Sequence, residues 1–285
     1  MSRLFLAVPA PAKLNLFLHV VGRRADGYHE LQSVFIPVDL ADLLDFERRA
    51  DGKIERTGDV IGDVGTDLAV RAAQALQQAS GTRSGASINV EKKIPAGSGM
   101  GGGSSDAAST LIALNRLWDL DWPRERLFPL AVALGADVPF FLGAGPAFVE
   151  GIGDRLTALA LAPAYYAVVH PQVAVSTREI FTDPGLTRDT KATIIAAFSA
   201  AQETLPEQLF GANDLELVVR RRYPAVDHAV RYLQRFGPAR LTGSGSAVFF
   251  PATGLEQATA AIQNLPSGWQ GWVVRSLAEH PLAVW

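Results

Sequence analysis

The spacing of apolar residues changes along the chain and predicts a first half that begins with strands and continues with helices. Up to about residue 60, short apolar runs separated by turn residues are typical of β-strands. The predicted strands are 14–21, 32–38, 43–49 and 53–57. From residue 67 to residue 80 the apolar positions follow helical spacing, with Thr66 as the expected N-cap.

A strand, a glycine-rich loop and a helix follow one another without interruption. Apolar and polar residues alternate over 86–90, which predicts a strand, and the segment PAGSGMGGGSSDAASTLIALNRLW comes directly after it. A further helix is expected over 123–135. An uncharged, Ala- and Pro-rich stretch then leads to a predicted strand over 165–169. We interpret the stretch as a linker and expect two domains, 1–160 and 161–285.

Helices dominate the second half of the chain. The expected helices are 191–201, 214–222, 225–236 and 255–264. The expected strands are 239–242, 247–250 and 272–275. Because strands and helices are interspersed rather than strictly alternating, the pattern predicts an α+β fold in both halves.

Composition and charge narrow the function classes. The 285 residues include 26 basic and 29 acidic ones, a net charge of −3, so no positive field favours nucleic acid as a partner. The local run 220–222, three arginines, is interpreted as a solvated helix face. The absence of cysteine excludes disulfides, thiolate metal sites and cysteine nucleophiles.

Two stretches imitate membrane signals. The apolar run Leu4–Val8 is shorter than the apolar region of a signal peptide, which takes about 7 to 15 residues. The uncharged stretch 156–177 contains Pro163, His170 and Pro171, which argue against a membrane span. We therefore expect a cytoplasmic protein without a membrane partner.

The glycine loop is the densest chemical signal. Glycines occupy positions 97, 99, 101, 102 and 103, immediately before an Ala- and Leu-rich helix. Inside a helix each glycine would cost about 1 kcal/mol, so they predict a backbone loop. Main-chain N–H groups at a helix N-terminus attract anions, and a phosphate group is the expected ligand.

Several alternatives stay open for this loop. A tight strand-to-helix turn without a ligand is one. The Walker loop is not matched, because no lysine follows the glycines. Gly97, Gly99 and Gly102 fit the bare dinucleotide pattern, but the acidic residue about 20 positions on, Asp121, lies just past a helix rather than at a strand end. A nicotinamide enzyme therefore remains a weaker alternative.

Lys13 and Asp137 are single charges among apolar neighbours, in VPAPAKLNLFL and LGADVPFFL. Taken separately, Lys13 could extend its ammonium to water and Asp137 could cap a turn before Pro139. Beside a phosphate loop they suggest a buried pair in which the carboxylate orients a substrate hydroxyl and accepts its proton. That chemistry is phosphoryl transfer.

A second glycine-containing segment and the histidines are also considered as candidate sites. Gly243 to Ser246 lie between two predicted strands, and they form either a hairpin turn or a place where backbone approaches a ligand. The five histidines show no ligand spacing, so no protein-bound metal site is expected. Any metal is expected to arrive with the nucleotide.

These motifs, in this order, resemble those of the GHMP kinase superfamily, small-molecule kinases with a glycine loop that is not of the Walker type. The blocks that carry the resemblance span residues 9 to 250: PAKLNLFLHVVGRRADGYHELQSVF, PAGSGMGGGSSDAA, GADVPFFL, STREIF, GANDLE and LTGSGSAVF. The block DGYHEL is the most specific of them. The resemblance implies a ribosomal S5 domain 2-like N-terminal domain and a ferredoxin-like C-terminal domain, with the active site between them.

The resemblance also implies an activity and its residues. ATP would give its γ-phosphate, with Mg²⁺, to the 2-hydroxyl of a cytidine-diphosphate-linked methylerythritol on the non-mevalonate route to isoprenoid precursors. Lys13 and Asp137 would be the catalytic pair. The implied ATP-binding residues are Pro95, Ala96, Gly97, Ser98, Gly99, Met100, Gly101, Gly102, Gly103, Ser104 and Ser105. The implied substrate-binding residues are Asn15, Tyr28, His29, Thr177 and Phe181.

Two departures and two alternatives accompany these expectations. Arg178 stands where the family usually has proline, and Ser98 stands where glycine or alanine is common. The alternatives are another kinase of this superfamily, acting on a small alcohol such as homoserine, and a non-catalytic nucleotide-binding module. The expected partners are small molecules, and the chain is expected to be a monomer or a homodimer.

Overall fold

A computed structural model describes residues 4–60, 62–204 and 208–285, and for 202–204 the backbone alone. In chain order the elements are β1 (Leu4–Arg23), β2 (His29–Arg49), β3 (Ile54–Gly58), the 3₁₀-helix η1 (Val64–Thr66), α1 (Leu68–Ser80), β4 (Gly85–Glu91), α2 (Gly102–Leu117), α3 (Arg124–Leu134), α4 (Val138–Leu142), β5 (Ala147–Gly151), β6 (Arg155–Ala158), β7 (Tyr165–His170), α5 (Thr177–Thr182), α6 (Ile195–Thr204), α7 (Glu216–Arg222), α8 (Pro224–Leu233), β8 (Arg240–Leu241), β9 (Val248–Ala252), α9 (Leu255–Ile262) and β10 (Gln270–Arg275).

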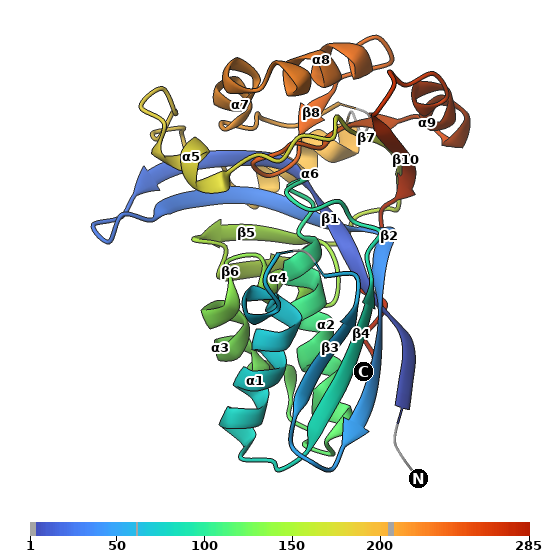
Figure 1. Ribbon diagram of the computed structural model, residues 1–285. Coiled ribbons are helices and arrows are strands. Elements are labelled where there is room, and N and C mark those ends of the chain that lie inside the picture. Colours follow the sequence, from blue (N-terminus) through green and yellow to red (C-terminus); the bar gives the residue numbers. More distant parts are fainter. Residues whose placement is uncertain (1–3, 61, 205–207) are drawn as a thin grey trace.

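Two sheets organise these elements. The first has the order β3-β4-β2-β5-β6, with β1 also paired to β2, and only its β3–β4 pair is parallel. The second is antiparallel with the order β10-β7-β9-β8. Helices α1 to α4 gather against the first sheet, and α7, α8 and α9 lie on the outer side of the second (Figure 1). The arrangement confirms the α+β prediction.

Three apolar clusters account for the packing. One lies between the first sheet and α1 to α4, and another between the second sheet and α7 to α9. The third lies between the two sheets and joins Leu14 and Phe17 of β1 to Val168 of β7 and Phe249 of β9. Because the middle of β1 packs on the second sheet, the loops at the ends of both sheets are held close together.

The strand β2 is longer than expected. The sequence predicts separate strands 32–38 and 43–49, but the backbone stays extended through the polar residues between them. Both carboxylates in this interval find main-chain donors: Asp39 accepts from Arg275 N at 2.8 Å, and Asp42 accepts from Ile94 N at 2.8 Å. Polar residues that are typical of a turn are therefore compatible with one continuous strand.

Two helix starts also differ from the predictions. The N-cap of α1 is Asp67, not Thr66: the Asp67 carboxylate accepts from Ala69 N at 2.8 Å, while the Thr66 hydroxyl donates to Asp63 O. Helix α6 begins at Ile195, four residues after the predicted start. The Gln32 side chain bonds both backbone groups of Thr193, and these bonds hold that residue outside the helix.

The run of arginines at 220–222 is more than a solvated face. Arg221 and Arg222 both form ion pairs with the Asp183 carboxylate, at 2.6 and 3.0 Å. Arg220 pairs with Glu216 on its own helix and with Asp227 on α8. Arg221 and Arg222 are exposed, as predicted, and the run also ties α7 to its neighbours.

The end of the chain returns to the first sheet. Leu282 belongs to the core beneath α1 to α4, and the Trp285 ring lies 5.1 Å from that of Phe5. The division into 1–160 and 161–285 stays a prediction. None of the helices in the described part of the chain has the length and apolar character needed to cross a membrane.

Candidate active site

Lys13 lies in the middle of β1 with 2% of its side chain exposed. Its ammonium nitrogen donates to Asn15 Oδ1 at 2.5 Å and lies 3.6 Å from Asp137 Oδ2. It also lies 4.8 Å from the centre of the Phe35 ring. Burial lowers the pKa of Lys13, and the charge and hydrogen bonding of Asp137 oppose that shift. The predicted pairing of Lys13 with Asp137 is therefore present, and the ammonium does not extend to water.

Asp137 stands at the first position before α4, and its side chain makes no capping hydrogen bond to that helix. One third of the side chain is exposed, in contrast to Lys13. The turn-capping alternative is therefore wrong. A carboxylate held by a buried cation and open on its other side can accept a proton from a bound hydroxyl group.

The glycine loop ends in a helix start that carries no side-chain cap. Gly101 is the N-cap of α2, and its backbone has a left-handed conformation, with φ at 75°. A Cβ on Gly101 would lie 3.0 Å from the Phe141 ring and 3.2 Å from Lys13 Cγ. The first N–H groups of an α-helix lack partners within the helix, so they are available to an anion beside Lys13.

The second glycine segment, 242–246, joins β8 to β9 and packs against the first. Ser246 N donates to Gly97 O at 3.1 Å, and Ala247 N donates to Ser98 O at 2.9 Å. A Cβ on Gly99 would collide with the Thr242 carbonyl oxygen. The turn between β8 and β9 is present, and its backbone packs closely on the first glycine loop. Gly243, Ser244 and Gly245 also line the cavity that contains Lys13 and Asp137, so approach to a ligand stays a prediction. Two loops about 140 residues apart thus brace each other.

Asn15 is held between Lys13 and the second glycine segment. Its Oδ1 accepts from Lys13 and from the Thr242 hydroxyl, the latter at 3.1 Å. Its backbone N–H donates to Thr242 Oγ1 at 3.0 Å, and its Nδ2 donates to Ser33 Oγ at 3.1 Å. Asn15 and Thr242 are both buried. The Asn15 amide therefore orients the Lys13 ammonium, whatever else it binds.

Three adjoining cavities lie along the site, and Lys13 and Asp137 line the middle one. The first, about 350 Å³, is lined by Pro95 to Gly99 and by Gly101 to Ser104. The second, about 330 Å³, is lined by Lys13, Asn15 and Asp137 and shares glycines of the loop with the first. The third, about 680 Å³, contains Tyr28 and His29 and shares Thr177 and Phe181 with the second. Because neighbours share lining residues, we treat the three as one trough.

Two predicted ATP-binding residues do not line the trough. Met100 packs in the core between the two sheets, where its carbonyl accepts from Lys13 N at 2.9 Å. Ser105 is fully buried in α2. Ser98, one of the two departures from the family pattern, lines the first cavity, and its hydroxyl accepts from Met100 N at 3.3 Å. The serine therefore supports the loop locally and leaves its glycine geometry intact.

Aromatic rings form the far end of the trough. Tyr28 is 62% exposed, and the His29 ring lies 5.1 Å from that of Phe181, tilted by 35°. Thr177 begins α5, and its hydroxyl lies 2.7 Å from Ser244 Oγ, which links α5 to the second glycine segment. Arg178, the other departure, is exposed and lines the third cavity without disturbing this link.

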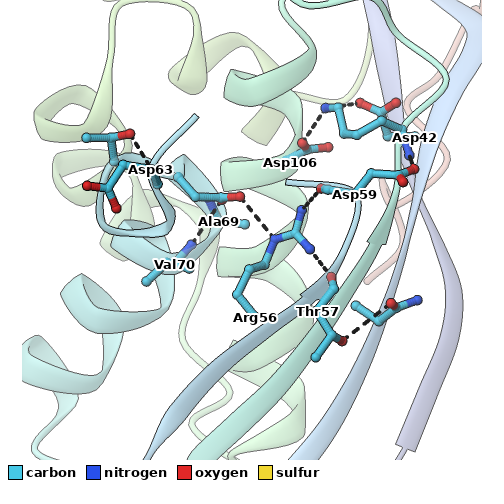
Figure 2. A network of polar contacts seen from close by, with 12 residues as sticks. Asp42, Arg56, Thr57, Asp59, Asp63, Ala69, Val70 and Asp106 are labelled. Atoms are coloured by element: carbon cyan, nitrogen blue, oxygen red, sulfur yellow. Dashed lines mark hydrogen bonds and ion pairs between the residues drawn. The ribbon is translucent and has the colours of Figure 1, made fainter. Parts of the chain in front are cut away.

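A charged network supports the glycine-loop end (Figure 2). The Lys92 ammonium bridges Asp42 at 2.5 Å and Asp106 at 2.6 Å, and so ties β2 to the first turns of α2. Burial raises the pKa of Asp106 to about 7, against the opposing charge of Lys92. Beside it, Arg56 pairs with Asp67 at 3.0 Å, which joins the middle of β3 to the N-cap of α1. Lys92, Arg56 and Asp67 all line the first cavity.

Sequence reasoning missed Thr242, Lys92 and Arg188, each of which contacts a predicted site residue or supports its loop. Lys92 lies three residues before the predicted loop, which begins at Pro95, and it is one of only five lysines in the chain. The scarcity of lysine could have indicated Lys92 as a candidate site residue. Thr242 and Arg188 are recognised only by their contacts with residues far away in the sequence, which no local sequence pattern predicts.

Comparisons with known proteins agree with this geometry. The family profile described as the N terminal domain of GHMP kinases matches residues 67–145, and that described as their C terminal domain matches 195–271. A 4-diphosphocytidyl-2-C-methyl-D-erythritol kinase of Ralstonia nicotianae is 53% identical over 278 residues, which cover 97% of this chain and 95% of that protein. The protein of the same name from Methylibium petroleiphilum is 52% identical, covering 98% of this chain and 96% of its own.

Solved structures agree as well. A crystal structure of 4-(cytidine 5'-diphospho)-2C-methyl-D-erythritol kinase matches with a TM-score of 0.80 and 34% identity, covering 97% of this chain and 99% of the other. A homoserine kinase from Cytophaga hutchinsonii matches with a TM-score of 0.65 and 19% identity, covering 98% and 95%, and so shares the fold alone. The chain belongs to the GHMP kinase family, among the proteins named 4-diphosphocytidyl-2-C-methyl-D-erythritol kinase.

Proposed function

We propose that this chain transfers the γ-phosphate of ATP to the 2-hydroxyl group of 4-diphosphocytidyl-2-C-methyl-D-erythritol. The observation that carries the proposal is the position of Lys13 and Asp137 at the centre of one trough. Backbone donors of a glycine loop line one end, and aromatic rings line the other. A nucleotide triphosphate and a cytidylyl acceptor entering from opposite ends would meet at this pair.

The reaction needs positioning and charge neutralisation more than a strong base. The glycine-loop amides and the start of α2 hold the phosphates, and Lys13 stabilises the charge on the transferred group. The acceptor oxygen forms a bond to the γ-phosphorus while the bond to the β–γ bridging oxygen breaks and ADP leaves. The proton of the acceptor hydroxyl passes to the Asp137 carboxylate.

The donor set of the trough fits a magnesium ion that arrives with ATP. Mg²⁺ typically takes one or two carboxylates together with phosphate oxygens. The Ser104 hydroxyl and the Asp137 carboxylate both line the second cavity, next to the phosphate loop. The described residues contain no group of three or more His, Cys, Asp or Glu side chains that would hold a metal without the nucleotide. When bound, the ion neutralises phosphate charge.

The aromatic end is proposed as the cytosine site. Tyr28 and Phe181 would stack on the flat base, and the His29 imidazole would hydrogen-bond its edge. Asn15 and Thr177 lie on the side nearer Lys13, where they would meet the polyol and the diphosphate. We further propose that the chain works in the cytoplasm, as a monomer or a homodimer, on small molecules.

An ADP-release assay across a panel of alcohols tests the proposal. We expect turnover with the cytidylyl polyol and none with homoserine or mevalonate, and we expect CDP to compete with the acceptor. Turnover of homoserine that CDP does not inhibit would establish the other kinase alternative. Nucleotide binding without transfer to any alcohol would establish a non-catalytic module.

A further inference from the structure

Arg188 connects the two parts of the aromatic end. It lies in the segment between α5 and α6, and its Nε donates to His29 Nε2 at 3.0 Å. Its terminal nitrogens donate to Phe181 O at 3.0 Å and to Asp183 O at 2.8 Å, and also to Leu186 O. One guanidinium therefore holds the His29 ring and the backbone that carries the Phe181 ring.

The bond from Arg188 determines where the His29 ring carries its proton. A guanidinium group donates and never accepts, so His29 Nε2 must present a lone pair. Burial lowers the pKa of His29, and the positive charges of Arg188 and Arg23 lower it further, which keeps the ring neutral. A neutral imidazole with an accepting Nε2 has its hydrogen on Nδ1.

The Nδ1–H group remains available to a ligand. Among the described residues no hydrogen-bond partner of His29 Nδ1 is found, and His29 lines the third cavity together with Tyr28 and Phe181. The His29 ring therefore offers its Nδ1–H group as a hydrogen-bond donor to a base bound in the third cavity. It cannot offer an acceptor there without breaking its bond to Arg188.

A donor at this position separates the two pyrimidine bases. N3 of cytosine is a hydrogen-bond acceptor, whereas N3 of uracil carries a hydrogen and is a donor. We propose that Arg188 is a specificity-determining residue, which fixes the Nδ1–H tautomer of His29 so that the site accepts cytosine and disfavours uracil. The inference rests on the proposed function, because it assumes that the aromatic end binds the base.

The tautomer can be measured without any substrate. Nitrogen-15 NMR of the imidazole rings distinguishes a protonated nitrogen from one with a lone pair, and the chain has only five histidines. His29→Gln identifies the signals. In the wild-type protein we expect Nδ1 protonated and Nε2 unprotonated, and in Arg188→Met we expect a mixture of both tautomers. A wild-type ring with its proton on Nε2 would overturn the inference.

Base preference provides the second readout. Binding of CDP and of UDP is compared in the wild type, in Arg188→Met and in Asp183→Asn. We expect the wild type to prefer CDP, and the Arg188→Met variant to lose about tenfold of that preference, because its freed ring can accept from uracil N3. Asp183 bonds the same loop through Gly185 N but does not touch His29, so Asp183→Asn controls for loosening of the loop.

The outcomes separate the two proposals. If Asp183→Asn changes the affinities for CDP and UDP by the same factor while Arg188→Met changes their ratio, the role of Arg188 is supported. CDP binding with an unchanged ratio in Arg188→Met contradicts that role alone. A wild-type chain that binds neither CDP nor UDP contradicts the proposed function, while the NMR result still decides the tautomer.

Discussion

Thr242 and Asn15 hold each other through two hydrogen bonds across the two sheets of the molecule. Asn15 N donates to Thr242 Oγ1 at 3.0 Å, and the same hydroxyl donates to Asn15 Oδ1 at 3.1 Å. Asn15 Oδ1 in turn accepts from the Lys13 ammonium. The second glycine segment therefore sets the direction of the buried lysine through one amide group.

Thr242→Val tests whether the hydrogen bonds between Thr242 and Asn15 orient the Lys13 ammonium. Valine keeps the shape of threonine but leaves the buried Asn15 N–H without its partner, which costs about 1 to 3 kcal/mol. We expect kcat to fall by about tenfold or more while KM for ATP stays the same. Thr242→Ser retains the hydroxyl and should recover most of kcat. If the valine and serine variants had equal kcat, the hydrogen bonds of Thr242 would have no part in orienting Lys13.

Lys92→Met tests the support behind the glycine loop. Removing the ammonium leaves Asp42 and Asp106 buried together without a cation. We expect a loss of about 3 to 5 kcal/mol in the free energy of unfolding, measured in urea. The control is Arg24→Met, which breaks the exposed pair with Asp26 and should change stability by less than about 1 kcal/mol. Equal effects of the two changes would argue against a structural role for the network.

His280 predicts a loss of stability in mild acid. The side chain is 4% exposed, and burial, aided by the charge of Arg124, lowers its pKa from 6.5 to about 4. At pH 5 the unfolded ring binds a proton and the folded ring does not, so stability falls as the pH drops through 6.5. Between pH 7.5 and pH 5, we expect the wild type to lose about 2 kcal/mol more than His280→Gln does. Parallel pH profiles of the two proteins would contradict this assignment.

Tyr28→Ala and His29→Ala test the base site. Loss of a stacking ring or of an edge hydrogen bond should weaken binding of the cytidylyl substrate by about tenfold to a hundredfold. Because both residues line the third cavity and neither lines the first, KM for ATP should be preserved. Isothermal titration with CDP and with a non-hydrolysable ATP analogue measures the two affinities separately. Equal losses for both ligands would exclude base recognition at this end.

Local patterns predicted the parts of the site that depend on local chemistry. The glycines before α2 break helix propensity, and Lys13 and Asp137 stand out as lone charges in apolar segments. Both signals survive in the structure, where the two charges lie 3.6 Å apart. The pairing could be inferred because a cation buried among apolar residues needs a partner, and Asp137 is a lone carboxylate in another apolar segment.

The features that the sequence did not predict share a physical cause. Each depends on a contact with a residue far away in the sequence. Thr66 and Asp67 are both good N-cap residues, and the carboxylate that also pairs with Arg56 takes that position. The polar interval within β2 remains extended because Asp42 accepts from the backbone after β4. The sequence around Arg188 does not distinguish it from other loop arginines, and only its hydrogen bond to His29 indicates a role at the site.

The Asp137→Asn variant tests the central claim most directly. Asparagine preserves the size of the side chain but cannot accept the hydroxyl proton as a carboxylate does. In single-turnover assays with saturating ATP and cytidylyl acceptor, the account predicts a rate about 10²- to 10⁴-fold below wild type, with ATP affinity nearly unchanged. A rate within a few-fold of wild type would contradict the proposed role of the Lys13–Asp137 pair.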